Sequence, residues 1–223
     1  MKYIPEVFSP EDEVARFVLA MTMAGGDIDR TLRLAAQAYA VDSPDATSYV
    51  RWTTGFFFEA QLALRAYEQT YPEVRNFLAA LPADARERLK VVRGFEQRLG
   101  GDLAEHARNY AFHFPHPSRR HALDGDTLLG RAVEHQTDEP VVVSAGVNAE
   151  GELAEVHYAF ANGLSLVLAF WPFAEDDAEL GRQQALVRDA ALAFRACAHE
   201  ILNAYLDSRP GSVSIRPLDT GGA

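Results

Sequence analysis

The amino-acid sequence predicts a mainly α-helical bundle, to which the second half of the chain can add one small β-hairpin. Three features indicate this fold. Helix-start signals made of Ser or Asp, Pro and early acidic residues recur along the chain. The apolar residues between these signals return every three or four positions, as they do on one face of a helix. A heptad pattern then occupies the last long run, 177–205.

The first predicted helices are delimited by start signals and by glycine or proline. Ser9-Pro10-Glu11-Asp12 places a capping residue, a first-turn proline and early acids before an apolar run. Gly25-Gly26 is expected to interrupt that helix, because glycine is a weak helix former, and Asp27 is expected to start the next piece. Ser43-Pro44-Asp45 repeats the start signal before a long helix that ends at Tyr71-Pro72.

An apolar stripe at helical spacing runs along that long helix. Its members are Trp52, Phe56, Ala60, Ala63 and Tyr67. Beyond it, Pro72 and Pro82 delimit a short helix, and another helix is predicted over about 84–99.

The sequence from residue 128 to residue 170 is less regular. A helix is predicted over 128–135. The β-branched run 140–143 is expected to be extended, the segment 148–151 to form a turn, and 153–160 to return as a second strand, which makes one hairpin. The apolar run 163–170 fits either a strand or a buried helix, because periodicity alone does not separate the two.

The final predicted helix has the clearest pattern in the chain. Asp176-Asp177 opens it, and its apolar residues step by seven and then alternately by four and three: Leu180, Val187, Ala191, Phe194, Ala198, Ile201 and Tyr205. Such a seam packs lengthwise against other helices, and it fits either the core of this chain or a dimer interface. The pattern as a whole predicts one helical domain over 1–209 and a flexible tail over 210–223.

Composition and charge exclude several classes of protein. Hydrophobic residues make up 48% of the 223 residues and charged residues 24%, which is typical of globular proteins and unlike disordered chains. Cys197 is the single cysteine, so no internal disulfide can form, and 1–6 lacks the apolar core of a signal peptide. The most apolar run, 164–173, is shorter than the ~20 residues of a membrane span. We therefore expect a cytoplasmic protein with no membrane partner.

One hexapeptide has the composition of a reaction centre: Arg108-Asn109-Tyr110-Ala111-Phe112-His113. It ends a helix predicted over 102–113, between a capping box and a proline. Asn109 and His113 share one face of that helix, and the long side chain of Arg108 can reach the same face. An imidazole in the last turn of a helix suits acid or base work near neutral pH, and a guanidinium can grip a phosphate with two hydrogen bonds.

The Arg-x4-His arrangement of this hexapeptide resembles that of the HEPN superfamily, helical-bundle proteins that include many metal-independent endoribonucleases. The resemblance implies a cleft between two protomers, so a homodimer is expected. It assigns Arg108 to the phosphate, Asn109 to orientation and His113 to proton transfer as a ribose 2′-hydroxyl attacks the adjacent phosphate. It also implies a toxin or phage-defence setting, with an antitoxin or another regulatory protein as partner. Pro115 stands where some toxin members have a modifiable Tyr, so that form of regulation is not expected.

The charge of the chain limits how it can hold RNA. Its 21 Lys and Arg residues against 32 Asp and Glu give a net charge of −11, which repels a polyanion. The segment 108–121, however, contains no acidic residue. Within it, His116, Arg119, Arg120 and His121 are candidate RNA contacts, and the contact they predict is weak and sensitive to salt.

Two other functions also fit the sequence. The motif can be a structural relic in a non-catalytic binding or regulatory module. A small molecule can instead occupy a pocket lined by Trp52 and the aromatic run 56–58, which otherwise forms core. His113, His116 and His121 lack the spacing of a helical ligand pair, so neither a metal nor another cofactor is expected. Nucleotide-binding loops and serine nucleophile elbows are not evident, which disfavours dehydrogenases, kinases and serine hydrolases.

Overall fold

The computed structural model describes residues 7–41, 43, 45–99, 143–147, 153–158, 174 and 176–209. Its elements are α2 (Glu13–Ala40), α3 (Ala46–Thr70), α4 (Pro72–Ala79), α5 (Ala83–Arg93), α6 (Phe95–Leu99), β1 (Val143–Val147), β2 (Leu153–Tyr158) and α10 (Asp177–Asp207). Helices dominate these ranges, so the predicted mainly α-helical bundle with one small hairpin is confirmed.

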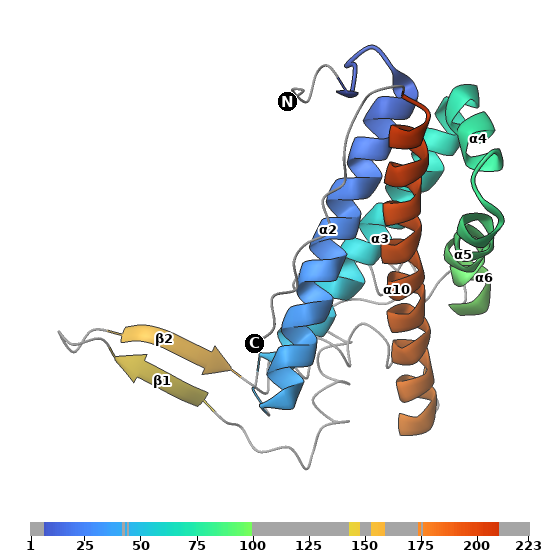
Figure 1. Ribbon diagram of the computed structural model, residues 1–223. Coiled ribbons are helices and arrows are strands. Elements are labelled where there is room, and N and C mark those ends of the chain that lie inside the picture. The colour runs from blue at the N-terminus through green and yellow to red at the C-terminus, as the bar shows by residue number, and fades with distance from the viewer. Residues whose placement is uncertain are drawn as a thin grey trace, which may run out of the picture.

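Three long helices, α2, α3 and α10, form the frame of the bundle (Figure 1). α2 and α10 run antiparallel, because Asp12 before α2 pairs with Arg209 beyond the end of α10, and Asp29 within α2 pairs with Arg195. α3 returns beside α2 after a short connection, and α4 packs against both of them. The shorter helices α5 and α6 lie against α10 (Figure 1).

Helix α2 follows the predicted start signal, but its cap is Asp12 rather than the expected Ser9, and the helix continues further than predicted. The Asp12 carboxylate caps its N-terminus by accepting hydrogen bonds from the N–H groups of Val14 and Ala15, at 2.9 and 3.1 Å. The predicted interruption at Gly25-Gly26 is wrong, since one helix runs from residue 13 to residue 40. At Gly25 the reason is close packing: a Cβ there would lie 2.8 Å from the Cβ of Ala198 on α10. The weak helix propensity of glycine is outweighed by this close approach of two long helices.

Prolines and a glycine divide the segment between α3 and residue 99. Pro72 occupies the first turn of α4 and Pro82 directly precedes α5, which confirms the short helix predicted between them. The single helix predicted over 84–99 is wrong, because Gly94 ends α5 and separates it from α6. The Gly94 N–H donates to the Lys90 carbonyl at 2.9 Å and closes the last turn of α5.

The buried face of α3 is shifted by about one residue from the predicted stripe. Ala60 is buried as expected, but Trp52 is 41% exposed. The face turned to the core is centred on Phe57 and Leu64, which are 0% and 1% exposed. The three consecutive phenylalanines at 56–58 explain the difference, because they allow the apolar stripe to be drawn through either of two neighbouring helical phases.

The heptad seam of α10 belongs to the core of this chain. Its residues Val187, Ala191, Phe194, Ala198, Ile201 and Tyr205 are buried, and the helix contacts α2, α3, α5 and α6. The predicted start at Asp176-Asp177 is confirmed, and the Asp176 carboxylate caps the helix by accepting a hydrogen bond from the Glu179 N–H at 2.7 Å. Of the two uses that the pattern allowed, the structure therefore shows packing within the protomer.

The two ends of the described chain are tied together beside Tyr205. This side chain is 1% exposed, and its hydroxyl donates to the Val7 carbonyl at 3.1 Å. Phe8 stacks on the Tyr205 ring with 5.3 Å between the ring centroids. Arg209 pairs with the Asp12 carboxylate and lies over the same ring, at 4.9 Å from its centroid. The tail predicted over 210–223 lies outside the described residues.

The predicted hairpin is present as β1 and β2, although its first strand covers 143–147 where the run 140–143 was expected; Val143 lies opposite Tyr158 and Ser144 opposite His157 in an antiparallel pair. The register shifts between Gly146 and Val147, which marks a bulge or irregularity next to the connection. The helix predicted over 128–135 and the apolar run 163–170 lie outside the described residues. None of the described helices is long and apolar enough to cross a membrane.

Candidate functional site

The predicted catalytic residues lie in a segment that the structure does not describe. Arg108, Asn109 and His113 fall within residues 100–142, as do the candidate RNA contacts His116, Arg119, Arg120 and His121. The chain enters this segment from α6, whose first and last residues, Phe95 and Leu99, are buried in the core. The described part of the molecule thus fixes where the motif segment starts, and the motif itself stays a prediction.

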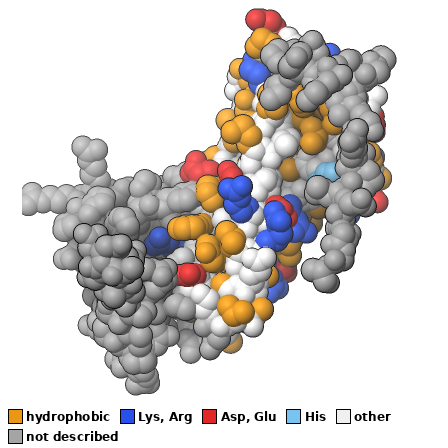
Figure 2. Space-filling model, turned by 60° about the vertical axis from the view of Figure 1, so that its left-hand side comes forward, with side chains coloured by type: hydrophobic (Ala, Val, Ile, Leu, Met, Phe, Trp, Pro, Cys, Tyr) orange, Lys and Arg blue, Asp and Glu red, His pale blue; other side chains and the backbone are white. Residues whose placement is uncertain are grey.

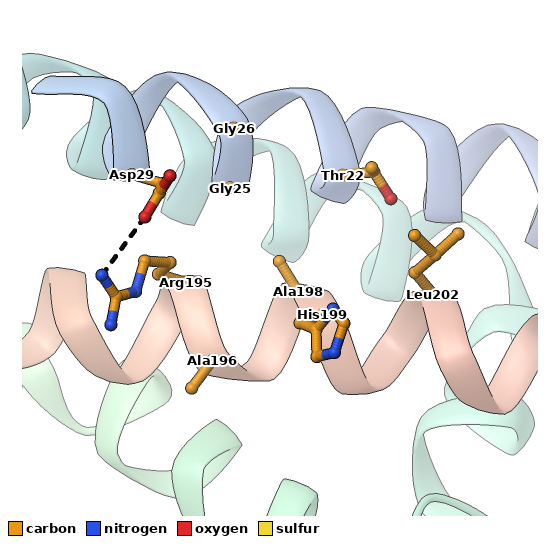
Figure 3. Close-up of a pocket in the computed structure, with 9 residues that line it drawn as sticks. All are labelled: Thr22, Gly25, Gly26, Asp29, Arg195, Ala196, Ala198, His199 and Leu202. Atoms are coloured by element: carbon orange, nitrogen blue, oxygen red, sulfur yellow. Dashed lines mark hydrogen bonds and ion pairs between the residues drawn. The ribbon is translucent and has the colours of Figure 1, made fainter. Parts of the chain in front are cut away.

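A groove between α2 and α10 is one of two candidate sites among the described residues (Figure 3). Its volume is about 480 Å³, and it is lined by Thr22, Gly25, Gly26 and Asp29 from α2 and by Arg195, Ala196, Ala198, His199 and Leu202 from α10. The lining combines small residues, glycine and alanine, with three ionisable side chains. It follows the line along which Gly25 lets the two helices approach each other.

The polar groups of this groove already have partners, some in the groove and some beside it. Asp29 pairs with Arg195 at 3.2 Å, as Figure 3 shows, and with Arg33 at 2.8 Å. The Thr22 hydroxyl donates to the carbonyl one helical turn earlier, at 2.8 Å. The His199 Nε2 lies 3.1 Å from the Asn203 Nδ2. The carboxylate of Asp29 is neutralised by two guanidinium groups. The groove is therefore a helix–helix contact stabilised by ion pairs, and its described lining residues offer no free group for a reaction.

A second cavity lies where α2, α3 and α10 converge, nearer the start of α10. Its volume is about 400 Å³, and its lining includes Leu32, Ala35, Ala36 and Tyr39 from α2, Val50, Thr53 and Thr54 from α3, and Gly181, Gln184, Ala185, Val187 and Arg188 from α10. Arg188 is the charged residue of this set, and none of the described lining residues is acidic. Mostly apolar walls with a few polar groups are typical of small-molecule sites.

The aromatic cluster predicted as an alternative pocket is mainly core. Phe57 and Phe58 are 0% and 3% exposed, and both pack against Phe95 with centroid distances of 4.9 and 5.6 Å. Trp52 faces outward and contacts Tyr49 edge-on. The side chains at 57 and 58 are therefore part of the hydrophobic core and do not line a ligand pocket.

Within the described ranges, no three His, Cys, Asp or Glu side chains gather in a way that could hold a metal ion. The histidine group at 113, 116 and 121 lies outside these ranges. Figure 2 shows basic side chains standing beside acidic ones on the face that it presents, interspersed with apolar groups. The described surface of that face is therefore mixed in charge, unlike the broad basic face of a duplex-binding protein.

Cys197 is buried at 2% exposure, and its Sγ lies 3.9 Å from the Ala85 carbonyl oxygen. Burial first, and then the nearby Glu200 carboxylate, raises the pKa of the thiol from 9.0 to about 12. The neutral thiol is thus favoured in the folded state. The contribution of the buried neutral thiol to the free energy of unfolding is fully present below pH 9.0 and is lost as the pH rises towards 12.

We expect Cys197 to resist alkylation by iodoacetamide in the folded protein at pH 8, because the thiolate is the reactive form and the side chain is enclosed. Mass spectrometry of native samples and of urea-unfolded samples measures the difference. The unfolded chain should be modified completely, while the native chain stays unmodified over the same time. Equal rates in the two states would contradict the buried position.

The cavity residues were missed by the sequence analysis. Gly181 and Ala185 carry no signal of their own, and their alignment with Ala35 and Ala36 depends on how distant helices meet. A run of small residues on facing helices is the signal that could have found them. Comparisons with known proteins add no guide to the function: no family model, no curated protein and no solved structure matches this chain.

Proposed function

We propose that this protein is a metal-independent RNA endonuclease of the HEPN type, which uses Arg108, Asn109 and His113. The observation that carries the proposal is the Arg-Asn-x3-His sequence, placed at the end of a predicted helix between a capping box and a proline. The mainly α-helical bundle of the described residues is compatible with this class of protein.

The proposed reaction is an internal transesterification of RNA. His113 accepts the proton of a ribose 2′-hydroxyl, whose oxygen attacks the adjacent phosphorus. Arg108 binds the phosphoryl oxygens, on which negative charge grows in the transition state. Asn109 orients the reacting groups. The bond to the 5′-oxygen breaks, and that oxygen takes up a proton from water as it leaves, while His113 releases the proton it accepted to the solvent. The products are a 2′,3′-cyclic phosphate and a 5′-hydroxyl end.

Two protomers are proposed to form the cleft, and RNA is proposed to be held weakly. The net charge of −11 opposes binding of a polyanion, so contacts from the acid-free segment 108–121 act locally and fade as salt rises. Such an enzyme needs control in a cell, which fits a toxin or phage-defence role with an antitoxin or another regulatory protein as partner. Cytoplasmic location follows from this role.

The proposal is tested by RNA cleavage with purified protein in EDTA. We expect cleavage in the wild type and a loss of at least about 100-fold in Arg108→Ala and in His113→Ala. Arg30→Ala and His199→Ala serve as matched controls, because both residues are exposed on long helices of the bundle and neither belongs to the motif. Analysis of the product ends should find the cyclic phosphate.

Folding is checked by circular dichroism and thermal unfolding of every variant. Cleavage that persists in Arg108→Ala and His113→Ala would overturn the assignment, as would cleavage that requires a divalent metal. A wild type that binds single-stranded RNA without cutting it would instead favour the non-catalytic binding module.

A further inference from the structure

We infer that the cavity between α2, α3 and α10 binds a small molecule with an apolar body and an anionic head, of the class of medium-chain carboxylates. The inference concerns residues far from the motif in the sequence and does not depend on the proposed nuclease activity. It rests on the space that the cavity offers, on the nature of its walls and on the charge at its edge.

The space exists because small residues from two helices meet. Gly181 and Ala185 on α10 and Ala35 and Ala36 on α2 line the cavity, and their small side chains leave room between the two helices. A Cβ built at Gly181 would find no heavy atom within 4 Å. A volume of about 400 Å³ lies within the range of small-molecule sites.

The walls are suited to an apolar body. Leu32, Val50 and Val187 contribute hydrocarbon surface. Thr53 and Thr54 also line the cavity, but their hydroxyls donate to the carbonyls of Tyr49 and Val50 at 2.8 and 2.9 Å. These hydroxyl protons are therefore satisfied within α3, so neither hydroxyl needs to donate to a ligand.

The polar part of the lining favours an anionic head. Arg188 is cationic, while Gln184 and Tyr39 add neutral groups that can donate hydrogen bonds. Arg188 pairs with the neighbouring Asp189 at 3.1 Å, but both side chains are more than 60% exposed, so this pair is weak and leaves donors for a carboxylate. The chain as a whole carries a net charge of −11. The described lining residues of this cavity include no acid and one arginine, so the cavity suits an anion better than the rest of the chain does.

The inference is tested by titrating the full chain with decanoate and, in parallel, with decanol and decylamine, using isothermal calorimetry. We expect saturable binding of decanoate with one site per chain, and an affinity about tenfold higher than that for decanol. Arg188→Gln should remove the preference for the carboxylate. Arg182→Gln is its control, because Arg182 lies on the same helix and also pairs with an acid but does not line the cavity.

Gly181→Leu tests the location of the site. Its side chain enters open space, so the fold should be kept while the cavity is filled and decanoate binding falls at least about tenfold. Gly26→Leu makes the same change at another helical glycine with open space around it, outside this cavity, and should bind decanoate like the wild type. Non-saturable binding, equal affinity for all three probes, or unchanged binding by Gly181→Leu would overturn the inference.

Discussion

Replacing Phe57 with Ala is expected to lower the free energy of unfolding by about 3–5 kcal/mol. Phe57 is fully buried, and its ring meets Phe95 of α6 at 4.9 Å and Phe194 of α10 at 6.4 Å, both edge-on. Truncation would remove contacts to two other helices at once and leave a cavity at their junction. Backbone relaxation can refill such a space only in part, because α3 and α10 are also held by their other contacts.

Urea denaturation followed by far-UV circular dichroism measures this loss. Trp52→Ala is the matched control, because it truncates a larger aromatic residue on the same helix that is 41% exposed. We expect that variant to lose about 1 kcal/mol or less. If Phe57→Ala were no more destabilising than Trp52→Ala, the position of the core on α3 would be wrong.

Adding one methyl group at Gly25 is expected to destabilise the protein, while the same change at Gly26 should stabilise it. A Cβ at Gly25 would lie 2.8 Å from the Cβ of Ala198, so α2 and α10 must move apart. Overpacking of this kind costs about 1–3 kcal/mol and exceeds the gain in helix propensity. At Gly26 a Cβ meets nothing within 4 Å, and the gain of about 0.5–1 kcal/mol remains.

Thermal and urea unfolding of Gly25→Ala and Gly26→Ala provide a direct comparison, because the two positions are adjacent on one helix and the substitutions are identical. Adding Ala198→Gly to Gly25→Ala should recover part of the lost stability, since it removes the overlapping methyl group. Equal effects of the two single changes would show that the helices do not approach as closely as described.

The fold could be predicted from the sequence where the determinants are local. The start signals at 9–12 and 176–177 are local, and each precedes a helix, although the cap of the first helix is Asp12 rather than the predicted Ser9. The hairpin was predicted from a β-branched run, a turn and a returning strand, which are equally local. The double glycine at 25–26 was misread because its role depends on Ala198, which is distant in the sequence. Tertiary packing here overrides helix propensity.

The candidate sites divide in the same way. The motif at 108–113 was recognised from its residue types and spacing, and it stays a prediction because the structure does not describe it. The cavity beside Gly181 was not predicted, because it is made by the absence of side chains where three helices converge. The predicted core face of α3 lies about one residue from the observed one, because the three phenylalanines at 56–58 fit two helical phases. Spacing alone does not choose between such phases.

The bond network around Tyr205 has a consequence for synthesis of the protein. Asp12 and Arg209, which this network joins, are 197 residues apart. At a translation rate of about 5–20 residues per second, the start of α2 waits on the order of 10–40 s before its partner Arg209, just beyond α10, is made. During that time α2 can pair with α3, but the surface that later receives α10 is exposed. The bundle therefore closes only after α10 has been made, and the nascent chain must keep that apolar surface from aggregating until then.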